Sequence, residues 1–185
     1  MRSLARVLFV CTANECRSPF AEALARQLAA EADLPISFES AGLDAWRRPT
    51  PDVGRLHARE RGLDLDQHVS RSVPWDDLGV YDVLLPLARS HSRELVAVDP
   101  SVRPRLFTVK QFARWLADHP RPRRAAIGPW LDVVAADRPA SELIGASSAD
   151  DVADPIGRPI EEWRAMSADL DPAISAILTG LFPQR

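Results

Sequence analysis

The chain has 185 residues, of which 46% are hydrophobic and 26% charged, and its formal net charge is −3. This length and composition are typical of one globular domain with a substantial core, so we expect a single domain over residues 1–185. The acidic balance argues against nucleic-acid binding. No stretch approaches the ~18 apolar residues that cross a membrane, and the N-terminal apolar run is too short for a secretory signal. The only two cysteines, Cys11 and Cys16, are too few for a disulfide scaffold, which favours a reducing, cytoplasmic location.

Strand and helix patterns alternate along the first two thirds of the chain. The short apolar run Val7-Leu8-Phe9-Val10 predicts a strand buried on both faces. A helix is expected over 19–30, because Pro19 suits a first turn and apolar residues then recur every fourth position. The sequence then predicts, in order, a strand at 36–40, a helix over 51–61 that ends at Gly62, a strand at 81–85, a helix over 90–97, a strand at 105–107 and a helix over 109–117. This alternation indicates an α/β fold, a three-layer αβα arrangement with a four-stranded parallel sheet.

The last third of the chain contains a proline-rich segment followed by one long helical pattern. The segment at about 118–150 is rich in proline, and we predict loop with one short helix near Leu131–Ala136 in a mobile insertion. Over 160–181, apolar residues repeat at spacings of three and four. This pattern predicts a long amphipathic helix that bends near Pro172.

The loop from Cys11 to Arg17 joins the first predicted strand to the first predicted helix. Ligands of open α/β sheets bind beyond the carboxyl ends of the strands, which is where this loop lies. A loop that enters a helix also points several free N–H groups at one spot. Such a field favours an anion and also favours the thiolate form of Cys11. Arg17 could hold two oxygens of a phosphoryl group, and Ser18 could donate to the sulfur. The loop therefore predicts a phosphate site with a thiolate nucleophile. The alternative is a buried cysteine and a surface arginine in an ordinary loop, a spacing that also arises by chance.

Four motifs in the same order resemble the low-molecular-weight protein tyrosine phosphatase family in its bacterial form. Residues 7–22 resemble the opening of that family, with its Cys-x5-Arg-Ser-Pro loop. Ser40-Ala41-Gly42, the stretch 62–71 with its Gly-Leu-Asp and His-Val-Ser-Arg, and Asp154-Pro155 resemble three later family motifs. The resemblance covers most of the chain in outline. It implies a four-stranded parallel sheet with the phosphate-binding loop between the first strand and the first helix.

The resemblance also implies a two-step reaction on phosphotyrosine. Cys11 would attack phosphorus and form a phosphocysteine, with Arg17 holding the phosphoryl oxygens. Asp154 would protonate the leaving group and then activate water; without the resemblance, a turn-forming aspartate before proline is the simpler interpretation. The remaining phosphate-binding or substrate-binding residues would be Thr12, Ala13, Asn14, Glu15, Cys16, Ser18 and Trp46.

Three of the assignments that the resemblance implies, those of His68, Trp46 and Cys16, carry a simpler alternative. Asn14 is expected in a left-handed conformation that Ser40 and His68 support by hydrogen bonds, although His68 could instead be an ordinary loop histidine. Trp46 would form a wall beside the substrate ring, with plain packing as the alternative. Cys16 would form a reversible disulfide with Cys11 under peroxide, although a small buried residue would also fit there.

Two departures from the family pattern bear on the substrate. Ile156-Gly157 follow Pro155, where the family often has aromatic residues, so the preference for phosphotyrosine is less firm than the phosphatase chemistry. Glu15 stands where the family is usually apolar, and a carboxylate there would repel a phosphate unless it points outward or meets a basic group. The expected partner is a phosphotyrosine protein or peptide, by analogy a tyrosine kinase of a polysaccharide system, bound by a monomer or weak dimer. No cofactor or metal is expected, because His57, His68, His91 and His119 show no ligand spacing with the cysteines.

Two rival functions fit the same loop. An arsenate reductase of this fold that relays electrons to thioredoxin needs cysteines beyond the middle of the chain, and none follows Cys16. A reductase that uses a small external thiol remains as an alternative. The other rival is a module that binds phosphorylated partners without turnover, which the presence of Cys11, Arg17 and Asp154 argues against.

Overall fold

A central parallel sheet organises the protein. The computed structural model describes residues 4–145 and 147–183, and within them three strands pair in the order β2–β1–β3. These strands are β1 (Ala5–Cys11), β2 (Ile36–Gly42) and β3 (Val83–Pro86). Cys11 lies opposite Gly42, and Val10 lies opposite Pro86. The carboxyl ends of the strands therefore meet at one edge of the sheet, where the loop from Cys11 to Arg17 begins.

The α/β class with a parallel sheet is confirmed, but the prediction of a fourth strand at 105–107 is wrong for the described residues. Leu106 makes only a single parallel bridge with Leu84, and the Phe107 N–H donates to the Leu84 carbonyl over 3.1 Å. The 3₁₀ helix η2 (Pro100–Arg105) ends at Arg105, and Thr108 is the N-cap of the next helix. Two residues remain between these helices, which is too few for a strand.

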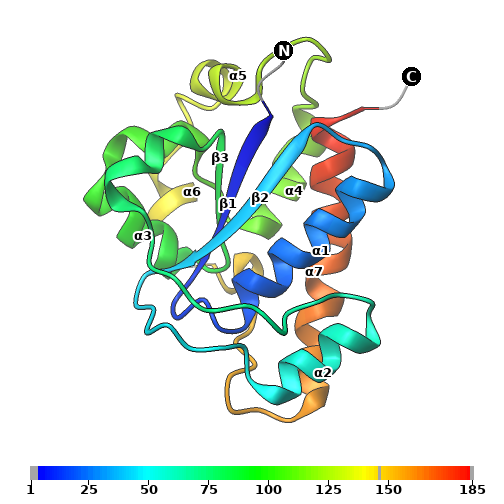
Figure 1. Ribbon diagram of the computed structural model, residues 1–185. Coiled ribbons are helices and arrows are strands. Elements are labelled where there is room, and N and C mark those ends of the chain that lie inside the picture. Colours follow the sequence, from blue (N-terminus) through cyan, green and yellow to red (C-terminus); the bar gives the residue numbers. More distant parts are fainter. Residues whose placement is uncertain (1–3, 146, 184–185) are drawn as a thin grey trace.

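Helices cover both faces of the sheet (Figure 1). One face carries α1 (Arg17–Glu31), α4 (Val109–Asp118) and α7 (Ile160–Leu181), and α2 (Asp52–Glu60) packs against α7. The other face carries α3 (Arg89–Val98), α6 (Ala140–Ile144), η2 and the 3₁₀ helix η1 (Trp75–Val80). The remaining elements are α5 (Ile127–Val134) and the 3₁₀ helix η3 (Ser148–Asp150). These bounds differ by at most a few residues from the helices predicted before residue 118 and after residue 159.

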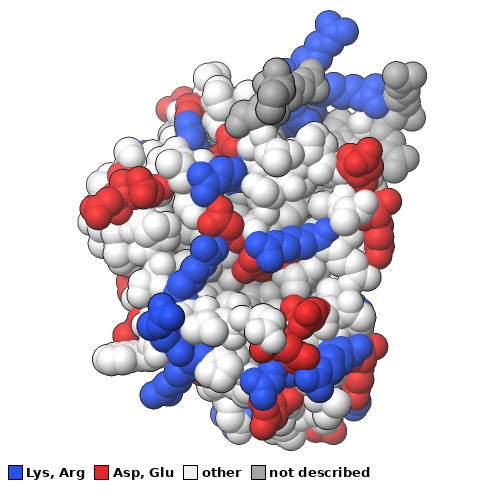
Figure 2. Space-filling model, viewed as in Figure 1, with Lys and Arg blue, Asp and Glu red and all other residues white. Residues whose placement is uncertain are grey.

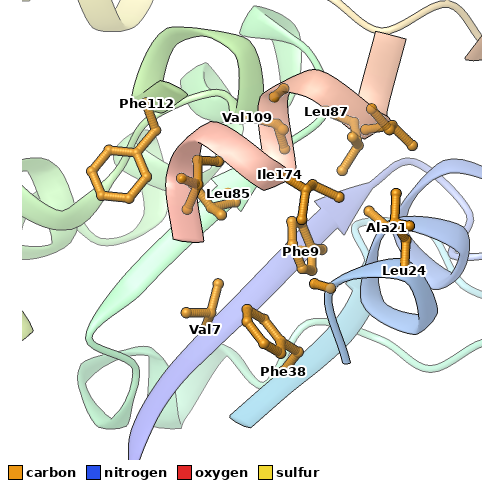
Figure 3. Close-up of a cluster of buried hydrophobic side chains, with 14 of the residues drawn as sticks. Val7, Phe9, Ala21, Leu24, Phe38, Leu85, Leu87, Val109, Phe112 and Ile174 are labelled. Carbon is orange, nitrogen blue, oxygen red and sulfur yellow. The ribbon is translucent and has the colours of Figure 1, made fainter. Parts of the chain in front are cut away.

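Alternate residues of β1 supply the two halves of the core. Val7 and Phe9 pack under α1, α4 and α7, where Figure 3 shows them with Phe38 and Ile174. The neighbouring side chains of β1 point to the opposite face and pack against α3, η1 and η2. Residues 7–10 of β1 are apolar at every position, which is typical of a sheet covered on both sides and agrees with the sequence pattern.

The segment at about 118–150 is more structured than predicted. It contains α5 and α6, where one short helix was expected, and residue 146 lies outside the described residues. The Arg138 guanidinium lies 3.4 Å from the centroid of the Phe107 ring and donates to the Leu106 carbonyl over 2.5 Å. This contact ties the segment to the core. Mobility of the segment stays a prediction.

On the face shown in Figure 2, basic and acidic side chains are interspersed over the surface. Within the described residues, no helix is long and apolar enough to cross a membrane.

The contact between α2 and α7 gives a stability prediction. A Cβ added at Gly54 would lie 2.3 Å from an atom of the buried Trp163 ring. We expect Gly54→Ala to lower the free energy of unfolding by ~1–3 kcal/mol, because the overlap outweighs the ~1 kcal/mol that alanine gains in a helix. Gly79→Ala is the control, since its Cβ would meet nothing within 4 Å. Urea denaturation measures both, and equal stability of the two variants would contradict the packing described here.

Candidate active site

The phosphate loop, residues 11–17, connects the end of β1 to the start of α1. Asn14 has a φ of 55°, a left-handed conformation that asparagine tolerates better than most residues. The loop lies directly against the end of β2, where a Cβ at Gly42 would come within 2.8 Å of the Ala13 carbonyl carbon and the Thr12 carbonyl oxygen. Glycine at residue 42 therefore allows the close approach of the two backbones, and the loop keeps its shape.

The Cys11 sulfur is buried at the base of this loop among hydrogen-bond donors. It accepts a hydrogen bond from the Asn14 N–H over 3.2 Å and lies 3.0 Å from the Ser18 hydroxyl oxygen. The Asn14 side-chain amide donates to that same oxygen over 2.9 Å, so the hydroxyl proton can go to the sulfur or to the Ala41 carbonyl 3.4 Å away, and the sulfur is the nearer acceptor. Two donors and the start of α1 thus favour negative charge on the sulfur.

Asn14 is itself held on every side. Its side-chain amide donates to the Ser40 hydroxyl over 2.8 Å, and its side-chain oxygen accepts the Arg71 backbone N–H over 3.0 Å. The His68 Nε2 donates to the Asn14 carbonyl over 2.7 Å. Ser40 and His68 thus contact Asn14, as the family resemblance implies, and the Arg71 backbone makes a third contact with it.

Arg17, the last residue of the phosphate loop, forms an ion pair with Asp154. Its Nη2 lies 2.6 Å from an Asp154 carboxylate oxygen, and its Nη1 donates to the Val152 carbonyl over 3.3 Å. The Arg17 side chain is 8% exposed and that of Asp154 is 37% exposed, so the carboxylate lies at the opening of the site. Residues 137 positions apart in the chain are thus in direct contact.

The loop that carries Asp154 is anchored by two preceding aspartates, which sequence analysis missed. Asp151 accepts the Arg89 backbone N–H over 2.7 Å, and the buried Asp150 carboxylate accepts the Arg89 Nε over 2.7 Å and also pairs with Arg114. Burial alone would raise the pKa of Asp150, but the hydrogen bonds from Arg114 and Arg89 outweigh burial and lower it. A charged Asp150 therefore fixes the start of the Asp154 loop against α3.

His91, in the first turn of α3, is a second residue that sequence analysis missed. Its Nε2 lies 3.0 Å from the Thr12 hydroxyl oxygen, and the residue is 3% exposed. Burial, with a smaller contribution from the charge of Arg17, lowers the pKa of His91 to about 4. The imidazole is therefore neutral near pH 7. No spacing in the sequence links residues 12 and 91.

Cys16 lies in the same loop and is buried, and both cysteines are free thiols in the structure. Burial, followed by the negative charge of Asp154, raises the pKa of Cys16. Cys16 is therefore a thiol at neutral pH and a poor nucleophile in its own right. Its reversible pairing with Cys11 stays a prediction.

The two loops that contact the phosphate loop carry exposed apolar side chains. Trp46 is 68% exposed on the loop after β2, and the Asp44 N–H ties that loop to the Thr12 carbonyl over 2.8 Å. Ile156 is 47% exposed on the Asp154 loop. Glu15, in contrast, is only 9% exposed within the phosphate loop. Among the described residues, no group of three or more His, Cys, Asp or Glu side chains is placed to hold a metal ion.

Comparison with known proteins finds similar sequences and the same fold elsewhere. Residues 6–121 match the family model of low molecular weight phosphotyrosine protein phosphatase. A low molecular weight protein-tyrosine-phosphatase of Bacillus subtilis is 38% identical over 85 residues, a match that spans 44% of this chain and about half, 54%, of that relative. A protein-arginine-phosphatase of Geobacillus stearothermophilus is 26% identical over 174 residues and 93% of both chains.

Solved structures extend the match to nearly the whole fold. The low molecular weight protein tyrosine phosphatase from T. tengcongensis superposes with a TM-score of 0.73 at 28% identity, over 96% of this chain and 99% of that one. The arginine phosphatase of Geobacillus stearothermophilus gives a TM-score of 0.68 at 26% identity, over 94% and 90% of the two chains. The matched segment 6–121 holds Cys11, Arg17, Ser40 and His68, whereas Asp154 lies beyond it.

Proposed function

The chain belongs to the low molecular weight phosphotyrosine protein phosphatase family, and we propose that it hydrolyses phosphotyrosine in proteins through a phosphocysteine on Cys11. One observation carries the proposal. The Cys11 sulfur, with two donors within 3.2 Å, lies in a loop whose closing Arg17 is already paired with Asp154. Nucleophile, phosphoryl clamp and acid thus lie together, which a module that only binds phosphate does not require.

In the first step, the Cys11 thiolate attacks phosphorus, an S–P bond forms and the P–O bond to the leaving group breaks. Arg17 and the N–H groups of the loop hold the phosphoryl oxygens as negative charge shifts onto the leaving oxygen. Asp154, protonated, gives its proton to that oxygen, so that an alcohol or phenol leaves rather than its anion.

In the second step, water attacks the phosphocysteine and Asp154 accepts a proton from the water. The S–P bond breaks, phosphate leaves, and Cys11 returns as the thiolate with the nearby Ser18 hydroxyl as a donor. The phosphoryl group must take over contacts of Arg17 that Asp154 holds in the structure, because one Nη2 cannot serve both fully. Binding of substrate therefore frees the Asp154 carboxylate for proton transfer.

A second candidate substrate, phosphoarginine in proteins, is favoured by a specific observation. The protein-arginine-phosphatase relative aligns over 93% of this chain, which is as broad a match as the 96% that the tyrosine phosphatase structure covers. Ile156-Gly157 also leave the Asp154 loop without the aromatic wall that would grip a phenyl ring. Glu15 places a carboxylate in the loop, which suits a cationic guanidinium better than a neutral phenol.

Four further assignments belong to this proposal, and those of the partner and of Trp46 rest on the family resemblance. The partner would be a phosphotyrosine protein or peptide, with a tyrosine kinase of a polysaccharide system as the finer candidate. The protein would act in the cytoplasm as a monomer or weak dimer. Trp46, exposed beside the phosphate loop, would be the wall for the substrate ring.

The substrate class can be tested with matched peptides. We expect kcat/KM on a phosphotyrosine peptide to exceed that on the same peptide with phosphoserine by at least ~100-fold, since the shorter side chain leaves phosphorus far from a buried sulfur. A peptide with phosphoarginine at the same position tests the second candidate. Higher kcat/KM on phosphoarginine would replace the first candidate, and faster reduction of arsenate with a small thiol than hydrolysis of any of these phosphopeptides would contradict both.

A further inference from the structure

The Thr12 hydroxyl is the polar side chain that follows the nucleophile, and it is exposed at the opening of the site. Two buried residues contact its oxygen. The Arg17 Nη2 donates to it over 3.4 Å, and the His91 Nε2 lies 3.0 Å away. A hydroxyl has two lone pairs and one proton, so these two contacts decide where the proton can point.

The protonation of His91 settles the direction of the second hydrogen bond. His91 is neutral, so only one of its ring nitrogens carries a proton. Its Nδ1 is buried and has no hydrogen-bond partner among the residues that the structure describes. A buried N–H without a partner is rarer in proteins than a buried acceptor without one, so the proton belongs on Nε2. The His91 Nε2–H then donates to Thr12, as the Arg17 guanidinium does.

With both lone pairs of Thr12 occupied, its own proton has to point away from Arg17 and His91, toward the open side of the phosphate loop. We propose that His91 is a positioning residue that orients the Thr12 hydroxyl as a hydrogen-bond donor to the bound phosphoryl group. This inference rests on the proposed function for its substrate. It adds a side-chain donor to the backbone donors of the loop and gives a role to a histidine outside every motif found in the sequence.

The place of His91 in the fold suits this role. The residue lies in the first turn of α3, and the N-terminus of that helix is fixed by the hydrogen bond from the Arg89 N–H to Asp151. The same aspartate precedes Asp154 by three residues. The orientation of Thr12 and the position of the Asp154 loop are therefore held by one rigid helix end.

A double-mutant cycle on the full chain tests the coupling. We expect Thr12→Val and His91→Leu each to weaken inorganic phosphate binding, and to lower kcat/KM on a phosphotyrosine peptide, by ~10-fold, the usual effect of one hydrogen bond to a charged group. The double variant should be no worse than Thr12→Val, because His91 acts through that hydroxyl. His91→Gln, whose amide can donate, should recover most of the affinity lost in His91→Leu, and Thr12→Ser, which keeps the hydroxyl, should bind phosphate more tightly than Thr12→Val.

Two measurements separate this role from simple packing. Nitrogen-15 NMR of the histidine ring should show the proton on Nε2 at pH 7, and His91→Leu should unfold at a similar urea concentration to the native protein. A proton on Nδ1, or multiplicative losses in the double variant, would overturn the inference. Phosphate binding and the ring proton are read without turnover, so a chain that hydrolyses no phosphoester would fail the proposed function while this test still stands.

Discussion

Replacing Cys11 with serine is expected to reduce turnover of every phosphomonoester by at least ~10³-fold while oxyanion binding persists. Hydroxyl is a far weaker nucleophile than thiolate at neutral pH. The phosphate loop should keep its shape without the sulfur, because Ser40, His68 and Arg71 hold Asn14 whether residue 11 is cysteine or serine. Isothermal titration with inorganic phosphate and steady-state rates on p-nitrophenyl phosphate would measure the two effects.

The matched control is Cys16→Ser, which makes the same chemical change five residues along the same loop. Burial keeps Cys16 a thiol, so we expect this variant to lose far less turnover than Cys11→Ser. Comparable losses in the two variants would mean that the loop is merely distorted by serine. Substantial turnover in Cys11→Ser would instead remove the phosphocysteine from the mechanism.

The beginning of the site could be predicted because its determinants are local. An apolar run, a loop with Cys11 and Arg17, and a proline in the first helical turn lie within twenty residues, and β1 and α1 form where that pattern places them. The shape of the loop depends on more. A left-handed Asn14 and a glycine opposite it at residue 42 matter only when β2 lies beside β1.

The distant parts of the site could be predicted only through family resemblance or not at all. Nothing local links Arg17 to Asp154, and the late Asp-Pro motif was the only signal that placed Asp154 in the site. His91 and Asp150 had no motif, since their roles arise from the packing of α3 against the phosphate loop and the Asp154 loop. The predicted strand at 105–107 failed for a similar reason. Its apolar pattern is correct, but η2 and the cap at Thr108 leave it no room to pair.

Replacing Asp154 with asparagine is expected to lower kcat/KM more for substrates with a basic, poor leaving group than for those with a good one. Asparagine can still accept the hydrogen bond from Arg17, but it has no proton to give to the leaving oxygen. Loss of a general acid typically reduces the rate by ~10²–10⁴-fold, and the full effect should appear with alkyl phosphates and unsubstituted phenyl phosphate. With p-nitrophenyl phosphate, whose phenolate leaves readily, we expect a much smaller loss.

The dependence on the leaving group separates this role from a structural one. If Asp154 only held Arg17 in place through their ion pair, its loss would change the position of Arg17 and slow the reaction of all substrates by one common factor. A series of substituted phenyl phosphates measures the slope, which should steepen in Asp154→Asn relative to the native chain. An unchanged slope would leave Asp154 as a partner of Arg17 alone. Because the same carboxylate activates water in the second step, the variant should also release a rapid burst of p-nitrophenol before a slow steady state, as phosphocysteine accumulates on Cys11.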